Sequence, residues 1–260
     1  MKRIKKTKII ATLGPATSSV ESIESLIKEG VDVLRINFSH STHKEAEKVI
    51  HEIRRINDSL STNTAILADL QGPKLRIGEV SENTELKDGD NIIIKTGKEF
   101  KGDSKTLYLN YNNLAKDIKK GEKILIDDGK IILKVIDIDK KNQITAEVIQ
   151  GGILSSNKGF NLPNTNISQP ALTEKDIEDA IFSAKQNVDW IALSFVRHGS
   201  DIESLVKLLD KNTNHRIPVI AKIEKPEGVR NIDEIMKYAS GIMVARGDLG
   251  VEINAAEVPL

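Results

Sequence analysis

The chain has 260 residues, which is enough for one large domain or two ordinary ones. Its 38 basic residues balance 38 acidic residues, so no net charge favours nucleic acid or a membrane surface as a partner. The absence of cysteine excludes disulfide bonds and thiolate metal sites. Because the sequence has neither a signal-peptide core nor an apolar run of membrane-spanning length, we expect a cytoplasmic protein.

The opening part of the chain alternates between short apolar runs and helical patterns. The runs at residues 8–13, 31–38 and 65–70 predict strands, and helical spacing predicts helices at about 18–30 and 42–58. Strands that alternate with helices in this way are typically parallel and joined by right-handed crossovers.

The character of the sequence changes between Gly72 and Pro170, where helix-length patterns largely disappear. Short β-rich runs take their place, at residues 91–95, 106–109, 123–126, 130–138 and 143–150. Turn signals such as Asp-Asp-Gly at 127–129 separate them. We therefore predict a small antiparallel β-barrel domain at residues 73–170, inserted into the αβ region.

The alternation resumes after the insertion. Three further helices are expected at about 174–186, 200–210 and 229–238, and three further strands at 189–195, 219–223 and 241–245. The six strands favour an α/β fold of the (β/α)8 TIM barrel type, truncated after strand six and formed by residues 1–72 and 171–260. A doubly wound open sheet is the alternative for the same pattern.

In TIM barrels the active-site groups lie at the carboxyl ends of the strands. Polar residues gather at those ends in four of the predicted strands. They are Arg35, Asn37 and Ser39 at the second strand, Asp69, Lys74 and Arg76 at or after the third, Lys222 and Glu224 at the fifth, and residues 246–250 after the sixth. We expect these side chains to converge on one rim.

The residue types narrow the chemistry at this rim. Glu224 and Asp248 offer the oxygen ligands that Mg²⁺ or Mn²⁺ prefers. A lysine such as Lys222 suits an oxygen that gains charge, as in an enolate or a transferring phosphoryl group. Arg35 and Arg76 supply planar donors for phosphate. The pattern indicates phosphorylated or enolate-forming substrates held through a metal.

Six motifs, in order along the whole chain, resemble those of the pyruvate kinase family. They are residues 7–17, Arg35-Ile36-Asn37-Phe38-Ser39-His40, Asp69-Leu70-Gln71-Gly72-Pro73-Lys74-Leu75-Arg76, Lys158-Gly159-Phe160-Asn161-Leu162-Pro163, Ala221-Lys222-Ile223-Glu224 and residues 244–252. The resemblance implies a barrel with a β domain inserted after strand three. It also implies phosphoryl transfer from phosphoenolpyruvate to ADP, giving pyruvate and ATP at the last step of glycolysis, in a homotetramer.

The resemblance assigns roles by position. Lys222 resembles the lysine that neutralises the migrating phosphoryl group and the enolate, and Arg35 resembles the arginine that contacts that group. Glu224 and Asp248 resemble the protein ligands of Mg²⁺ or Mn²⁺. The backbone of Gly247 and Asp248 matches the donors for the substrate carboxylate. Lys222 and Arg35 are thus the expected catalytic residues.

The nucleotide side is also implied by the resemblance. Its matching positions are Pro15, Asn37, His40, Arg76 and Lys158. Asp127 or Asp128 is similar to the aspartate of the inserted domain that meets the metal–nucleotide when this lid closes. Closure would exclude water and favour transfer to ADP over hydrolysis.

A monovalent-cation site follows from the resemblance, with one departure. Its expected ligands are Asn37, Ser39, Asp69 and Leu70. The potassium-requiring form of the family has threonine, lysine and glutamate where this chain has Leu70, Gln71 and Lys74. The ammonium of Lys74 could supply the positive charge that K⁺ brings, so we expect no K⁺ requirement.

The family's last two barrel units and its C-terminal domain, with the usual effector site, have no counterpart before the chain ends at Leu260. We therefore expect a fragment with weak or no activity alone.

Two other functions fit parts of the pattern. A Mg²⁺-dependent enolate lyase or aldolase would explain the two carboxylates but not the inserted domain or Lys222. A non-catalytic module would only bind nucleotide or pair with a full-length subunit.

Overall fold

The computed structural model describes residues 6–139 and 143–260. They form two compact units. The first takes in the chain up to Gly72, then Ala171–Ile223 and Glu227–Val244. The second takes in Pro73–Pro170, Glu224–Pro226 and Ala245–Leu260.

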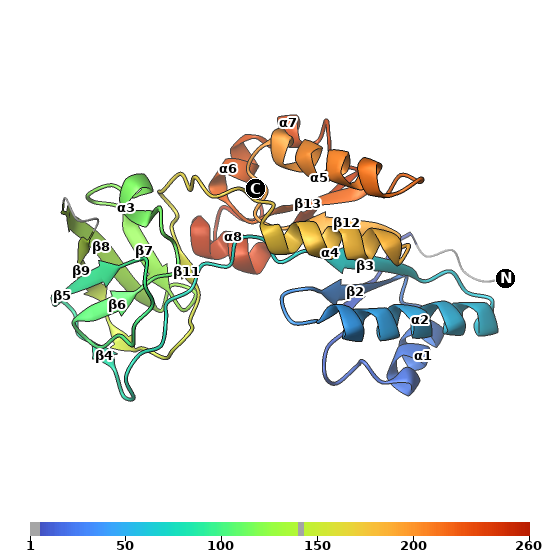
Figure 1. The fold of residues 1–260 in the computed structure, drawn as a ribbon, viewed down its shortest axis with the longest axis horizontal. Coiled ribbons are helices and arrows are strands. Elements are labelled where there is room, and N and C mark those ends of the chain that lie inside the picture. Colours follow the sequence, from blue (N-terminus) through green and yellow to red (C-terminus); the bar gives the residue numbers. More distant parts are fainter. Residues whose placement is uncertain (1–5, 140–142) are drawn as a thin grey trace. The chain divides into compact units, whose positions relative to one another are not determined.

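The first unit is built on a six-stranded sheet in which every neighbouring pair is parallel. Its strands, in spatial order, are β1 (Ile10–Thr12), β2 (Val33–Asn37), β3 (Ala65–Asp69), β12 (Trp190–Leu193), β13 (Val219–Ile223) and β14 (Gly241–Val244). The connecting helices are α1 (Val20–Lys28), α2 (His43–Leu60), α4 (Glu174–Lys185), α5 (Gly199–Asn212), α6 (Pro226–Arg230) and α7 (Ile232–Ile235). Figure 1 shows strands and helices alternating along this unit, which confirms the predicted α/β class.

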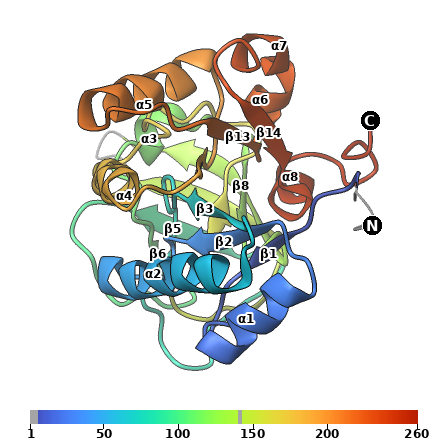
Figure 2. The same cartoon turned by 90° about the vertical axis from the view of Figure 1, so that its right-hand side faces the viewer.

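The helices pack on one face of this sheet. In Figure 2, α1, α2, α4 and α5 follow one another around the outside of the strands. Leu34 and Ile36 of β2 are buried in the core that these helices complete, together with Ile50 and Ile53 of α2. Arg35, between the two apolar residues of β2, points to the opposite face because side chains alternate along a strand. The polar residues of β2 therefore lie on the face of the sheet opposite to the helices.

One predicted helix is broken in the structure. The helix expected at about 229–238 is instead the pair α6 and α7, which meet at Asn231. The Asn231 side chain donates a 2.8 Å hydrogen bond to the Arg197 carbonyl. An asparagine that bonds a neighbouring loop in this way competes with continuation of the helix.

A buried carboxylate joins the two segments of the first unit that flank the insertion. Asp176, in the first turn of α4, accepts hydrogen bonds from the Gly72 and Thr173 backbone N–H groups at 3.0 and 2.9 Å. Gly72 has a φ of +70°, and an added Cβ would lie 2.7 Å from the Phe195 ring. Glycine is therefore required at the point where the chain leaves this unit.

The second unit contains a six-stranded sheet in the order β11-β7-β8-β9-β5-β6 and a two-stranded ribbon. The sheet strands are β5 (Asn91–Lys95), β6 (Thr106–Tyr108), β7 (Lys123–Ile126), β8 (Ile131–Ile138), β9 (Ile144–Gln150) and β11 (Phe160–Asn161). The ribbon pairs β4 (Glu85–Leu86) with β10 (Gly152–Ile153), and the helices are α3 (Leu114–Asp117) and α8 (Arg246–Glu252). Alternate residues, such as Ile92 and Ile94 or Leu133 and Val135, fill its core.

One strand pair departs from the antiparallel prediction. β5 and β6 are parallel, whereas the other pairs of this sheet are antiparallel. Residues 96–105 carry the chain back to the start of β5 instead of reversing in a hairpin, which aligns the two strands in the same direction.

Within the described residues, no helix is both long and apolar enough to cross a membrane.

We predict that Asp176→Ala lowers the free energy of unfolding by about 3 kcal/mol. The substitution removes the acceptor of the buried Gly72 N–H and of the half-buried Thr173 N–H, and each such loss costs about 1–3 kcal/mol. Urea unfolding followed by circular dichroism measures the change. Glu178→Ala, at an exposed position of the same helix, is the matched control and should leave the midpoint unchanged. Equal midpoints for the two variants would contradict the structural role of Asp176.

Candidate active site

A buried carboxylate and two cations occupy the carboxyl ends of the central strands of the first unit. Arg35 Nε donates a 2.7 Å hydrogen bond to Asp69 Oδ2, and Arg35 Nη2 forms an ion pair with the same oxygen. The parallel register of β2 and β3 makes this possible, because it sets Asn37 opposite Asp69 and Arg35 opposite Leu67. Asp69 is 1% exposed, and these partners offset the cost of burying its carboxylate.

Lys222 reaches the same carboxylate from β13. Its Nζ lies 3.2 Å from Asp69 Oδ1, an ion pair without hydrogen-bond geometry, and donates a 2.7 Å hydrogen bond to Ser194 Oγ. Ser194 Oγ in turn donates to the Leu70 carbonyl at 2.8 Å. The Lys222 side chain is only 10% exposed, and its ammonium contacts groups from two other strand ends, those of β3 and β12.

Ser194 did not emerge from the sequence as a site residue. It follows β12, the fourth strand of the sheet, at the same end as Asp69 and Lys222. The rule that active-site groups lie at the carboxyl ends of strands could have revealed it. Applied to β12, whose carboxyl end has no charged residue, the rule points to Ser194.

The other residues predicted on this rim lie in turns at the same strand ends. Pro15 lies in a turn after β1, where Thr17 N–H donates to the Gly14 carbonyl. Asn37 Oδ1 accepts a 3.0 Å hydrogen bond from Ser39 N–H, and the His40 N–H donates to the Asn37 carbonyl. The structure thus brings the predicted residues of the first unit to one end of its sheet.

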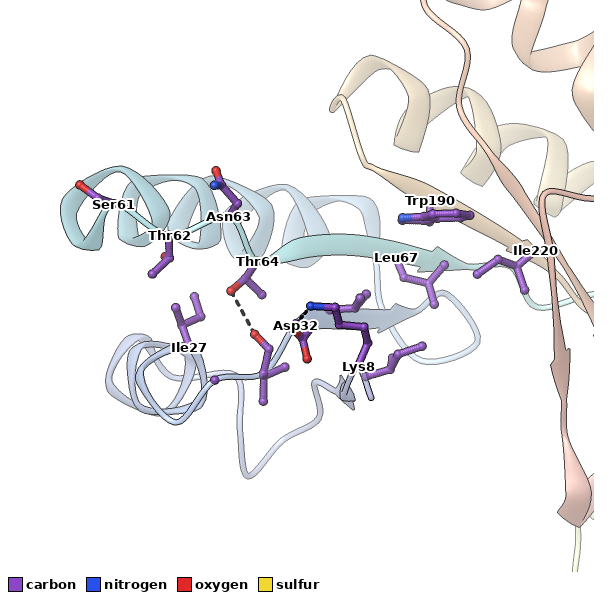
Figure 3. A pocket seen from close by; sticks show the side chains of 14 residues that line it. Lys8, Ile27, Asp32, Ser61, Thr62, Asn63, Thr64, Leu67, Trp190 and Ile220 are labelled. Carbon is purple, nitrogen blue, oxygen red and sulfur yellow. Dashed lines mark hydrogen bonds and ion pairs between the residues drawn. The ribbon is translucent and has the colours of Figure 1, made fainter. Parts of the chain in front are cut away.

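A cavity of about 780 Å³ opens at the opposite end of the same sheet (Figure 3). Leu67, Trp190 and Ile220 line it from the strands, and a 3.2 Å ion pair between Lys8 and Asp32 borders it. Trp190 and Ile220 lie in the amino-terminal halves of their strands, away from the carboxyl ends at which the active sites of α/β folds are built. This cavity is therefore separate from the rim that carries Arg35 and Lys222.

The two predicted metal ligands belong to the second unit. Glu224 is buried directly after β13, and Asp248 is exposed in the first turn of α8. Gly247, just before Asp248, has open space where a Cβ would stand. Throughout the described residues, no three His, Cys, Asp or Glu side chains form a group that could hold a metal by themselves. Two carboxylates fit Mg²⁺ or Mn²⁺, which usually keep positions for substrate and water oxygens.

Three residues predicted for the nucleotide side or the lid come together in the second unit. The Lys158 ammonium lies 2.9 Å from Asp127 Oδ1, and the Lys130 ammonium lies 2.9 Å from Asp127 Oδ2. Hydrogen bonds from Lys130 and Lys158 lower the pKa of the Asp127 carboxyl below its ordinary value. The backbone of Arg76 forms an antiparallel β-bridge with Gly159, the residue after Lys158. The Arg76 guanidinium donates a hydrogen bond to the Asn157 carbonyl.

The backbone at Asp127 is unusual. Asp127, Asp128 and Gly129 have consecutive positive φ angles of 52°, 57° and 83°. Two non-glycine residues in the left-handed region store strain, and such strain gathers at functional sites. Asp127 is engaged by lysines while Asp128 is exposed, so the two candidates that the sequence left open differ in environment.

Lys74 also lies in the second unit, in the segment between Pro73 and Pro170. Its carbonyl accepts a 2.9 Å hydrogen bond from Asn110 Nδ2, which anchors the backbone at this position. Whether its ammonium replaces a monovalent cation stays a prediction.

Known proteins match this chain over almost its whole length. A family model described as "Pyruvate kinase, barrel domain" matches residues 4–260. The chain belongs to the pyruvate kinase family. It is 44% identical over 256 residues to a pyruvate kinase of Corynebacterium glutamicum, covering 98% of this chain and 54% of that protein.

Other pyruvate kinases are similar to the same extent. The protein from Geobacillus stearothermophilus is 44% identical over 262 residues, which cover 100% of this chain and 44% of the relative. The protein from Mycobacterium tuberculosis is 40% identical over 257 residues, which cover 98% and 54%. The chain therefore spans about half the length of these pyruvate kinases.

We predict that Asp69→Asn lowers the free energy of unfolding by about 3 kcal/mol, because it leaves Arg35 and Lys222 side by side without the buried negative charge. Chemical denaturation at pH 7 measures the loss. Asp58→Asn makes the same change at an exposed position on α2 and should have no measurable effect. If Asp69→Asn were as stable as the wild type, the carboxylate would not be what holds the two cations.

Proposed function

We propose that this chain carries the phosphoryl-transfer residues of a pyruvate kinase, which converts phosphoenolpyruvate and ADP to pyruvate and ATP. The observation that carries the proposal is the Lys222 ammonium, buried and held by Asp69 and Ser194 at the carboxyl end of the sheet. A structural role alone does not require a buried lysine to be fixed by a carboxylate that already pairs with Arg35. Membership of the family supports the same reaction.

The finer fold is part of this proposal. We infer that the six parallel strands are six successive units of a (β/α)8 barrel, with residues 1–72 and 171–260 as the barrel domain and 73–170 as an inserted β-barrel lid. The strand order β1-β2-β3-β12-β13-β14 supports it, because it follows the sequence without reversal. A doubly wound sheet needs a point at which the order reverses.

The cationic residues have distinct roles in the proposed reaction. Arg35 binds the phosphoryl group through donors that Asp69 and Thr12 keep oriented. Lys222 neutralises the charge that develops on the phosphoryl oxygens and on the enolate oxygen. Since both cations are already fixed in the folded protein, little reorganisation is needed when the charge develops.

Glu224 and Asp248 would hold Mg²⁺ or Mn²⁺, and the backbone N–H groups of Gly247 and Asp248 would bind the substrate carboxylate. A divalent ion bound there supplies Lewis-acid stabilisation of phosphate and enolate oxygens. Pro15, Asn37, His40, Arg76 and Lys158 would line the nucleotide side. We propose that Asp127 or Asp128 meets the metal–nucleotide when the lid closes and excludes water.

The monovalent site and the assembly complete the proposal. Asn37, Ser39, Asp69 and Leu70 would form the cation site of the family, and Lys74 would supply the positive charge in place of K⁺. The intact enzyme would be a cytoplasmic homotetramer.

We predict that Lys222→Met lowers the rate of pyruvate formation by about 10²–10³-fold, because it removes the charge that stabilises the transition state. The full-length protein is assayed with phosphoenolpyruvate, ADP and Mg²⁺. Lys207→Met, at an exposed ion pair on α5, is the control and should keep the wild-type rate. A wild type without phosphoryl transfer but with aldol or lyase turnover would favour the second enzyme class. A Lys222→Met variant with unchanged turnover would overturn the role of this lysine.

We also predict that turnover persists when K⁺ is replaced by a tetraalkylammonium salt at equal ionic strength, with a rate within about twofold of the K⁺ value, because the Lys74 ammonium would supply the positive charge that K⁺ brings. Lys74→Glu restores the glutamate of the potassium-requiring form and should create a K⁺ requirement. A large loss of wild-type rate without K⁺ would refute this role of Lys74.

A further inference from the structure

A second buried ion pair lies in the second unit, next in sequence to the proposed metal ligands. Lys225 Nζ is 2.7 Å from Glu252 Oε1, and the two side chains are 5% and 1% exposed. Lys225 directly follows Glu224, and Glu252 lies four residues after Asp248 on α8. Positions four apart share one face of a helix, so Asp248 and Glu252 are neighbours on α8.

The pair is tied to a third segment. Asn161 Nδ2, in β11, donates a 2.8 Å hydrogen bond to the same Glu252 Oε1, and the Leu162 carbonyl lies 3.5 Å from Lys225 Nζ. Figure 1 shows α8 beside β11, as these contacts require. Glu252 Oε2 is buried and has no hydrogen-bond partner among the described residues. One carboxylate thus joins the segment 224–226, helix α8 and strand β11.

This arrangement is poorly explained by stability. Removing two charges from water costs several kcal/mol per ion, and a pair of packed apolar residues often serves a fold as well or better. The unpartnered Oε2 adds to that cost. An ion pair does have one property that apolar packing lacks. It fixes the position of one particular atom relative to another, here Lys225 Nζ relative to Glu252 Oε1.

Helix α8 has particular need of such an anchor. It has seven residues and no side-chain hydrogen bond at its N-cap, Ala245. Short helices are marginal by themselves and depend on tertiary contacts. Asp248 in its first turn is exposed, so the direction of its carboxylate depends on how the rest of the helix is held.

We propose that Lys225 and Glu252 are positioning residues for the metal site. Their ion pair fixes the segment that carries Glu224 against the helix that carries Asp248, and Asn161 orients the shared carboxylate. The inference rests on the proposed function insofar as it takes Glu224 and Asp248 to be the ligands. Mutation of residues that orient metal ligands without touching the metal commonly lowers the metal affinity of the site by about 10–100-fold.

The experiment compares Mn²⁺ binding, by electron paramagnetic resonance of free Mn²⁺, with thermal unfolding of the same full-length variants. Glu252→Gln leaves the buried Lys225 ammonium without its counter-charge and should lower both the melting temperature and the Mn²⁺ affinity. The double variant Lys225→Met/Glu252→Leu removes both charges. It should return to near the wild-type melting temperature, yet bind Mn²⁺ about tenfold more weakly or worse.

Kinetics give a second readout that a purely structural pair would not move. In the double variant the Mn²⁺ concentration for half-maximal rate should rise about tenfold, while the rate at saturating Mn²⁺ falls less than about threefold. Asn161→Ala, which removes a single hydrogen bond to Glu252, should weaken Mn²⁺ binding about twofold to fivefold and tests the proposal if the double variant does not fold. Lys207→Met is the matched control and should change none of these quantities.

The outcomes separate this inference from the proposed function. Glu224→Gln should abolish the tight Mn²⁺ site. If it does, but the double variant and Asn161→Ala bind Mn²⁺ as the wild type does, the positioning role is wrong and the metal site stands. If the wild type binds no Mn²⁺, or Glu224→Gln binds it unchanged, the ligand assignment itself fails and the positioning role fails with it.

Discussion

The candidate site of the first unit depends on the burial of one negative charge, that of Asp69, between two positive ones. Burying a carboxylate that is 1% exposed costs free energy unless it has partners of opposite charge, and the same holds for a buried lysine. Arg35 and Lys222 satisfy Asp69 from strands on either side of it in the sheet order. The ion pairs with Arg35 and Lys222 therefore offset the cost of burying Asp69, and both cations lie on the rim.

The parallel sheet delivers this arrangement by register alone. β2, β3, β12 and β13 are neighbours, so their carboxyl ends meet, and alternation puts Arg35 on the face opposite to Leu34 and Ile36. The apolar residues that pack against the helices and the polar residues of the proposed site are thus different members of the same strands. Folding of the core and assembly of the rim are one process.

The sequence was sufficient for features that depend on pattern. Periodicity located the alternating strands and helices, and the rule for strand ends found Arg35, Asp69 and Lys222 as a group. It missed Ser194, because an uncharged serine in an apolar strand carries no signal of its own until Lys222 is seen to donate to it.

Features set by a single long-range contact were beyond the sequence. The break at Asn231 depends on a carbonyl from a loop more than thirty residues earlier. The pairing of Lys225 with Glu252 joins segments that no local pattern relates. The parallel pairing of β5 with β6 depends on the path of residues 96–105, which propensity does not determine.

The hydrogen bond between Gly72 and Asp176 has a consequence for the order in which the protein folds. It joins positions 104 residues apart, on either side of the insertion, and β3 pairs with β12 across the same gap. Closing a flexible loop of that length costs roughly 4 kcal/mol of chain entropy. A chain whose inserted region has already become compact closes a much shorter effective loop, so early folding of residues 73–170 speeds the joining of the two halves of the parallel sheet.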